Sequence, residues 1–337
     1  MSMENVKLSV LITTYNIEKY VDETLKSVLA QKTDEKFEVL VGDDGSSDGT
    51  VGVVKKWQEK YPDIISLYVM DRDNNVKYNR IERASKNRIN LIKHAKGEYF
   101  IFLDGDDFYN DDTKYDKQIK LLDSKEYQDC VACGHNSWIY WNEDKKELIN
   151  RCEKKIVVKS SDYWKYGMYL LSNSIMFRNI YRDGSSEKIP VSYFDDNMIT
   201  FCALSKGDIL YIPDVMACYR QLDNSSWNSV DDIEKNIINL IDLDIELRVD
   251  KSFRKESIYR HLYSMYYIWR HPDEVTDEVY NKFAAQIERD RLSWTKHWLL
   301  YKKYGKLRKM KMSAWMCATL FRYIFVKIGR KIFKKYL

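Results

Sequence analysis

Strand-like apolar runs alternate with helix-like segments along the first third of the chain. The apolar runs begin at Leu8, Phe37, Ile65 and Tyr99, and segments with apolar residues every three to four positions follow the first three of them at 17–31, 50–60 and 87–95. The polar residues from 71 to 86 are expected to form a connection that precedes the last of these helices. Strands joined through helices form right-handed crossovers, so we expect an α/β fold with a mixed, mainly parallel sheet flanked by helices.

Three of the apolar runs end in polar residues. The polar groups are Thr13–Asn16, Asp43–Ser46 and Asp104–Asp107. Ligands of mainly parallel α/β sheets bind outside the carboxyl ends of the strands. We therefore expect these three groups, which are far apart in the sequence, to converge on one cleft.

The third polar group is unusual because it concentrates carboxylates. Asp104, Asp106 and Asp107 directly follow the apolar run, with Gly105 between the first two. Neighbouring carboxylates repel one another unless a cation or hydrogen-bond donors compensate their charge. Hard oxygen ligands suit Mg²⁺ or Mn²⁺, so the sequence predicts a divalent cation here. The alternative is an acidic turn that caps the next helix.

The positive charge of the chain is concentrated near its C-terminal end. The net charge is +4, yet residues 291–337 hold 14 Lys/Arg and no Asp/Glu, so the rest of the chain is acidic. Apolar residues at helical spacing, such as Trp315, Leu320 and Ile324, adjoin this charge. Such a segment fits an anionic membrane surface. Packing on the body of the protein is an alternative, and a nucleic-acid partner is not expected because the segment is too apolar for an arm that follows phosphates.

The remaining features concern location and organisation. The start of the sequence lacks a basic stretch followed by a long apolar one, so we expect a cytoplasmic protein with reduced cysteines. Together with the basic C-terminal segment, this predicts a peripheral location on the inner face of the cell membrane. We expect an α/β domain over 1–225 and a helical region over 226–337 that ends in the basic segment. The oligomeric state, a homo-oligomer included, stays open.

Four segments carry a family resemblance. SVLITTYN, EVLVGDDGSSDGT, GEYFIFLDGDD and FDDNMITFCALSKGDI occur in the order and approximate spacing of the inverting family 2 nucleotide-sugar glycosyltransferases, which have the GT-A fold. The resemblance implies a metal-dependent enzyme that transfers a sugar from a nucleotide sugar to a hydroxyl group. The acceptor would be a glycan or a lipid-linked oligosaccharide of bacterial surface-polysaccharide synthesis. A UDP-sugar is the favoured donor.

The resemblance also implies roles for individual residues. Asp104-Gly105-Asp106 resembles the Asp-X-Asp motif of the family, with Asp107 as a supporting ligand of Mn²⁺ or Mg²⁺. Asp196, or next to it Asp195, would be the general base that activates the acceptor, although both could instead cap a helix. The expected donor-binding residues are Thr13, Tyr15, Asp43, Asp44, Arg88, Asp104, Gly105, Asp106 and Arg220.

Two departures and two rival functions qualify this prediction. The family commonly has Asn after the residue equivalent to Arg88, where this chain has Ile89, and often has His shortly after the residue equivalent to Arg220, where this chain has Leu222 or Asp223. One rival function is a glycosyltransferase-like module that binds without catalysis. The other is a sugar nucleotidyltransferase, which usually has a glycine-rich first loop that Leu8–Asn16 lacks. The donor sugar, the acceptor and the linkage stay open.

Overall fold

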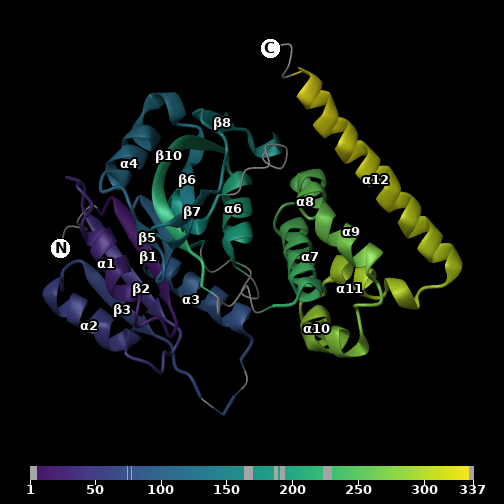
Figure 1. Cartoon of the computed structure of the whole chain (residues 1–337), viewed down its shortest axis with the longest axis horizontal. Coiled ribbons are helices and arrows are strands. Elements are labelled where there is room, and N and C mark those ends of the chain that lie inside the picture. Colours follow the sequence, from purple (N-terminus) through teal and green to yellow (C-terminus); the bar gives the residue numbers. More distant parts are fainter. Residues whose placement is uncertain are drawn as a thin grey trace. The chain divides into compact units, whose positions relative to one another are not determined.

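The chain forms two compact units. The computed structural model describes residues 6–73, 75–76, 78–162, 170–185, 189, 194–222 and 230–333. The first unit comprises Met1–Ser160 and Met168–Asp223, and the second comprises Ser161–Gly167 and Asn224–Leu337. Figure 1 shows the sheet of the first unit and the helices of the second.

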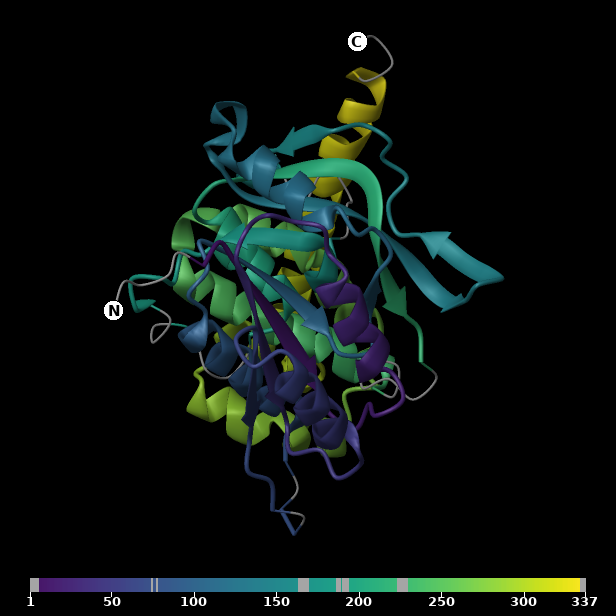
Figure 2. The same cartoon turned by 90° about the vertical axis from the view of Figure 1, so that its left-hand side faces the viewer.

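The first unit is built on the predicted alternation of strands and helices. Its elements are β1 (Leu8–Thr14), α1 (Val21–Leu29), β2 (Phe37–Asp43), α2 (Thr50–Lys60), β3 (Ile65–Val69), α3 (Arg80–His94) and β4 (Tyr99–Asp104). The four strands are parallel and lie in the order β3-β2-β1-β4. Helices α1 and α2 cover one face of this part of the sheet and α3 covers the other, as the two views together show (Figures 1 and 2). The expected mainly parallel α/β fold is confirmed.

Burial on both faces explains why these strands are apolar along most of their length. Val10, Leu11 and Ile12 in β1 are fully buried, as are Ile101 and Leu103 in β4. A strand covered by helices on both sides has no polar face, so it shows a continuous apolar run instead of alternation.

Helix α3 begins earlier than the sequence analysis placed it. The helix was expected from residue 87, but it starts at Arg80 because the Asn79 side chain accepts hydrogen bonds from the backbone N–H groups of Ile81 and Glu82. This cap satisfies donors that would otherwise lack partners at the helix start. Seven residues assigned to the polar connection therefore belong to the helix.

The rest of the first unit extends the sheet and makes it mixed. Its elements are β5 (Phe108–Tyr109), α4 (Lys114–Asp123), β6 (Cys130–Asn142), β7 (Lys145–Leu148), β8 (Ile156–Val158), β9 (Ile175–Arg178), α6 (Asp196–Leu204) and β10 (Asp208–Arg220). Strand β9 runs antiparallel to both β4 and β6, and β10 runs parallel to β6. This arrangement places β10 and α6 beyond β4, on the side of the sheet away from β3.

The second unit is helical. It contains α7 (Asp232–Val249), α8 (Arg254–Arg260), α9 (Leu262–Arg270), α10 (Asp277–Arg289), α11 (Ser293–Leu299) and α12 (Lys306–Phe333). Buried carboxylates on α7 join these helices: Asp244 caps α11 by accepting the backbone N–H groups of Trp294 and Thr295, and Glu246 pairs with Arg260. Among the described residues, no helix has both the length and the apolar character needed to cross a bilayer.

Candidate active site

The carboxyl ends of β1, β2 and β4 bring the three polar groups together, as predicted. Thr14 of β1 lies opposite Asp43 of β2, and Thr13 lies opposite Asp104 of β4. Side-chain hydrogen bonds join the same pairs: Thr13 Oγ1 donates to Asp104 Oδ1 at 2.6 Å, and Thr14 Oγ1 donates to Asp43 Oδ2 at 2.8 Å. The strand register therefore sets the geometry of the site.

Asp43 builds the turn after β2. Its side chain is fully buried, and its oxygens accept hydrogen bonds from the Ser46 backbone N–H at 2.7 Å and the Ser46 hydroxyl at 2.6 Å, besides that from Thr14. Gly45, at a φ of 74°, provides the left-handed backbone conformation that this turn needs. Asp43 thus holds the loop in place, and this geometry does not favour the direct donor contact expected for it.

Asp44 is paired with two arginines that sequence analysis did not identify. Arg83 Nε donates to Asp44 Oδ1 at 2.5 Å, and Arg72 lies 3.7 Å from Asp44 Oδ2. Burial raises the pKa of Asp44 above its ordinary value, against the lowering effect of Arg83. The Arg72 guanidinium also lies 4.2 Å above the ring of Tyr15, which is 42% exposed. Tyr15, Arg72 and Asp44 thus offer an aromatic face, a cation and a carboxylate side by side.

Asp104 and Asp106 are the carboxylates at this site that are neither deeply buried nor occupied on both oxygens. The Asp104 side chain is 33% exposed, and Asp106 is half-buried. Burial and the neighbouring Asp104 raise the pKa of Asp106 to about 6. Neighbouring carboxylates repel one another, so a cation bound between them would be favoured.

Gly105 lets the chain between these carboxylates pass close to β1. Its N–H donates to the carbonyl oxygen of Thr13 at 2.8 Å, and its own carbonyl accepts from the Thr24 hydroxyl at 2.7 Å. A Cβ atom at this position would lie 2.5 Å from Ile17 Cδ1 and 2.8 Å from Thr14 Cγ2. Only glycine fits without displacement of its neighbours.

This crowding leads to a prediction for Gly105→Ala. We expect the free energy of unfolding to fall by about 1–3 kcal/mol, because the added methyl overpacks the contact with Ile17 and Thr14. The matched control is Gly52→Ala in α2, where no atom lies within 4 Å of the added Cβ. Alanine there is expected to stabilise the helix by about 0.5–1 kcal/mol. Urea unfolding measures both changes, and equal effects at the two glycines would contradict the tight fit at Gly105.

Asp107 faces inward. It is 2% exposed; its Oδ1 accepts the backbone N–H of Arg220 at 2.9 Å, and its Oδ2 accepts from Asn173 Nδ2 at 2.7 Å. Burial and the neighbouring Asp106 raise its pKa well above the ordinary value. Both oxygens of Asp107 are engaged inside the protein, so this residue joins β10 to the segment Asp104–Asp107, which we call the acidic loop. This geometry does not favour the supporting metal-ligand role expected for Asp107.

Arg220, at the end of β10, contacts the backbone of the acidic loop. Its Nε donates to the carbonyl oxygen of Asp106 at 2.8 Å, and its Nη2 pairs with Glu23 at 2.6 Å. The guanidinium also lies 4.9 to 5.4 Å from the rings of Phe108, Tyr20 and Tyr140. Such an enclosed arginine positions the backbone of Asp106, and its contacts differ from the diphosphate contact expected for it.

Arg88 of α3 links the acidic loop to α6. Its Nη2 lies 3.3 Å from Asp104 Oδ1 and 3.4 Å from Asp196 Oδ1. The guanidinium is 12% exposed, so the attraction between these charges is screened by solvent less than it would be at the surface. Two carboxylates far apart in the sequence therefore share one cation.

Asp195 and Asp196 have different surroundings although they are neighbours in the sequence. Asp195 is the N-cap of α6, and its side chain accepts the backbone N–H of Met198 at 2.9 Å. Asp196 lies in the first turn, and its Oδ1 lacks a hydrogen-bond partner beyond the ion pair with Arg88. Burial and the nearby Asp104 raise the pKa of Asp196 to about 6, against the lowering effect of Arg88. Asp195 is thus engaged in capping α6, whereas Asp196 pairs with Arg88.

Two carboxylates, and not a complete protein cage, are available for a metal. Among the described side chains, no group of three or more His, Cys, Asp or Glu is arranged to hold an ion. Asp104 and Asp106 still fit Mg²⁺ or Mn²⁺, because these ions commonly take one or two carboxylates and complete their coordination with water and substrate phosphates. The hard oxygen donors of these two neighbouring carboxylates agree with such an ion.

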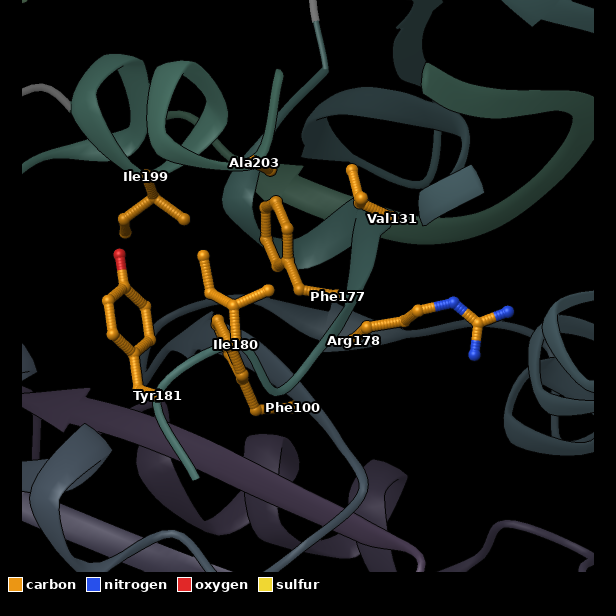
Figure 3. Close-up of a pocket in the computed structure, with 8 residues that line it drawn as sticks. All are labelled: Phe100, Val131, Phe177, Arg178, Ile180, Tyr181, Ile199 and Ala203. Atoms are coloured by element: carbon orange, nitrogen blue, oxygen red, sulfur yellow. The ribbon is translucent and has the colours of Figure 1, made fainter. Parts of the chain in front are cut away.

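A separate small pocket lies between α6 and the sheet (Figure 3). Phe100, Phe177, Ile180 and Ile199 give it an apolar lining, and the guanidinium of Arg178 points away from these side chains in Figure 3. An apolar lining does not suit a charged nucleotide sugar. We therefore regard this pocket as a packing gap beneath α6.

Sequence comparisons give several relatives. An uncharacterized protein from Mycobacterium tuberculosis is 26% identical over 223 residues, which are 66% of this chain and 61% of that protein. The poly(ribitol-phosphate) beta-N-acetylglucosaminyltransferase TarS from Staphylococcus aureus is 37% identical over 118 residues, 33% of this chain and 18% of TarS. A dTDP-rhamnosyl transferase from Shigella flexneri is 28% identical over 148 residues, 43% of this chain and 47% of that protein. The chain thus spans less than two thirds of the length of these relatives.

Solved structures show the fold, and a family model shows the family. The structure of S. aureus TarS residues 1–349 with UDP-GlcNAc superposes with a TM-score of 0.58 at 20% identity, over 77% of this chain and 72% of that one. The mannosyltransferase PcManGT from Pyrobaculum calidifontis, solved with GDP-Man and Mn²⁺, gives a TM-score of 0.50 at 15% identity, over 96% and 89%. The family model described as glycosyl transferase family 2 matches residues 9–185, more than half of the chain. The chain therefore belongs to glycosyl transferase family 2.

Proposed function

We propose that this protein is a metal-dependent, inverting glycosyltransferase that moves a sugar from a nucleotide diphosphate to a hydroxyl group. One observation carries the proposal: Arg88 Nη2 lies within 3.4 Å of both Asp104 and Asp196. The candidate metal ligand and the candidate base therefore lie beside the same guanidinium. Transfer needs this proximity, because the acceptor oxygen must reach the carbon that carries the diphosphate.

The donor would lie across the strand ends. Tyr15 offers an exposed ring against which a nucleobase can stack. Asp44 is only 8% exposed and its Oδ1 is paired with Arg83, so its Oδ2 would have to accept the imide N–H of a uracil. Arg72, held above Tyr15, supplies positive charge beside the base. This combination favours a uridine donor. The TarS complex with UDP-GlcNAc agrees with that choice, whereas the PcManGT complex holds GDP-Man.

The diphosphate would lie at the acidic loop after β4. Asp104 and Asp106 would hold a divalent cation there, with Thr13 orienting Asp104 by its 2.6 Å hydrogen bond. Such a cation, when bound, would offset the negative charge that develops on the leaving diphosphate. Gly105 keeps the backbone between the two carboxylates close to β1, and Arg220 fixes the carbonyl group of Asp106 by a hydrogen bond.

Asp196 would remove the proton of the acceptor. As the acceptor oxygen bonds to the anomeric carbon, the bond from that carbon to the diphosphate oxygen breaks on the opposite face, and the hydroxyl proton passes to the carboxylate of Asp196. The products are the glycoside with inverted configuration and a nucleoside diphosphate. Arg88 is a positioning residue in this scheme, since it orients Asp196 towards Asp104.

The acceptor is proposed from its chemical class. A general base beside a metal-bound donor suits a sugar hydroxyl. The name of TarS gives poly(ribitol-phosphate) as its acceptor and N-acetylglucosamine as its sugar, and the dTDP-rhamnosyl transferase transfers a rhamnosyl group according to its name. We therefore propose a glycan or lipid-linked oligosaccharide of bacterial surface-polysaccharide synthesis as the acceptor.

The proposal is tested with nucleotide sugars and Mn²⁺. Because a ligand that binds only the native state stabilises it, UDP-sugar with Mn²⁺ should raise the melting temperature by about 5 °C at a hundredfold excess over Kd. The same mixture should release UDP slowly, and EDTA should stop the release. GDP- and dTDP-sugars are tested in the same assays as comparison donors, to see whether UDP-sugar is preferred. Binding without release under any acceptor would indicate a non-catalytic module, and release of pyrophosphate would indicate a nucleotidyltransferase.

A further inference from the structure

One face of helix α12 packs on the other helices of the second unit. Met312 and Met316, one turn apart, are 6% and 0% exposed. Ser313 joins α12 to α9, since its hydroxyl accepts from Trp269 Nε1 at 3.0 Å, and the ring of Tyr323 lies 5.7 Å from that of Tyr259 in α8. This face of α12 is a structural contact.

A different face of α12 is apolar and exposed. Leu307, Met310, Phe321 and Ile324 are exposed by 68%, 59%, 70% and 50%. Together with the exposed Ala314 and Cys317, they recur at alternating intervals of three and four residues, which places them on one side of the helix. We call Leu307, Met310, Ala314, Cys317, Phe321 and Ile324 the outer stripe. Large apolar side chains that form a continuous stripe in solvent indicate an interaction surface.

The charge around the outer stripe identifies the partner. Lys306, Lys311 and Arg322 are exposed on the same helix, and the sequence has no Asp or Glu after Asp290. Spacing of three and four residues would also suit a coiled coil with a second copy of α12, but like charges beside its apolar seam would repel one another, whereas opposite charges favour such pairing. Two copies of α12 would present only basic residues to one another. An acidic lipid surface supplies both the apolar layer and the negative charge.

We propose that the outer stripe lies on an anionic membrane while the opposite face of α12 stays packed on the second unit. The apolar side chains would enter the boundary between headgroups and acyl chains, and the flanking lysines and arginine would contact acidic headgroups. One helix thereby holds the protein at the bilayer surface without crossing it. This inference does not depend on the proposed function, since it uses only the second unit.

Flotation of the full chain with lipid vesicles tests the inference. We expect strong binding to vesicles of phosphatidylcholine and phosphatidylglycerol, weak binding to phosphatidylcholine alone, and loss of binding at high salt. Phe321→Glu is expected to lower the bound fraction about tenfold or more, because a charged side chain replaces one that enters the lipid. Lys311→Gln combined with Arg322→Gln should lower binding to anionic vesicles only.

The control is Tyr263→Glu in α9, at a position 67% exposed outside the outer stripe, and it should bind vesicles like the unchanged protein. The inference is overturned if Phe321→Glu and Tyr263→Glu bind equally, or if binding ignores the lipid charge. It is also overturned if analytical ultracentrifugation finds a dimer that Phe321→Glu dissociates while vesicle binding is absent, because a second copy would then cover the stripe.

Discussion

Replacing Asp196 by asparagine is expected to lower kcat for sugar transfer about a thousandfold, within the range typical of a lost general base. The amide keeps the size of the side chain but cannot accept the acceptor proton. Because Asp196 contacts no donor-binding residue other than Arg88, which still pairs with Asp104, the Kd for the nucleotide sugar should change little. Steady-state transfer assays and equilibrium binding of UDP-sugar separate these two effects.

Asp195→Asn is the matched control. Asp195 caps α6 by accepting the N–H of Met198, and asparagine caps helices as well as aspartate does. Its kcat should therefore stay within about threefold of the unchanged enzyme. A large loss of kcat in Asp195→Asn together with a mild one in Asp196→Asn would move the role of the base to Asp195.

The pH dependence of the reaction should report the same group. Asp196 acts as a base only when ionised, so kcat/KM should rise as the pH passes its pKa and then level off. Burial raises that pKa to about 6, while a bound cation would offset the charge of Asp104, one of the groups that raise it. We expect the acidic limb to fall between about pH 4 and 6. A limb above pH 7 would contradict the assignment.

The position of the site was predictable from the sequence because strand register determines it. Apolar runs buried on both faces are easy to recognise, and each of β1, β2 and β4 ends at the polar residues that follow its run. Parallel pairing then places Thr13 beside Asp104 and Thr14 beside Asp43 without any further information.

The roles of individual residues within each polar group were not predictable in this way. Asp43 and Asp44 are adjacent, but one is fully buried in a turn and the other pairs with Arg83. Asp106 and Asp107 are also adjacent, and they differ because neighbouring residues on a chain can point in opposite directions. Which of them meets Asn173 depends on a segment 66 residues away. Local sequence does not hold that information.

Arg72 and Arg83 were missed for two different reasons. Arg83 lies on the part of α3 that was taken for a connection, and the N-cap signal of Asn79 could have revealed it. Arg72 lies in an irregular segment between β3 and α3, where no periodicity predicts the direction of a side chain. Its placement over Tyr15 is a tertiary contact between loops 57 residues apart in sequence and appears only in the folded protein.

Replacing Asp106 by asparagine is expected to lower metal-dependent transfer about a hundredfold and to leave the protein without metal as stable as before or more stable. The loss follows because a ligand of the cation disappears, and the cation contributes several kcal/mol to the charge stabilisation of the transition state. Stability should not fall, since the substitution removes a charge that is disfavoured both by burial and by the neighbouring Asp104, the two causes that raise the pKa of Asp106 to about 6. Transfer assays over a range of Mn²⁺ concentrations, with melting curves in EDTA, measure both effects.

Asp107→Ala should show the opposite pattern and is the control that separates a metal ligand from a structural carboxylate. Alanine leaves the Arg220 N–H and the Asn173 amide without their acceptor inside the protein, which should lower the free energy of unfolding by about 1–3 kcal/mol. Below its melting temperature this variant should keep the Mn²⁺ concentration for half-maximal activity of the unchanged enzyme. If Asp107→Ala shifts that concentration while Asp106→Asn does not, the cation is held by Asp107. The acidic loop must then change conformation when the donor binds, so that the buried Asp107 side chain becomes exposed.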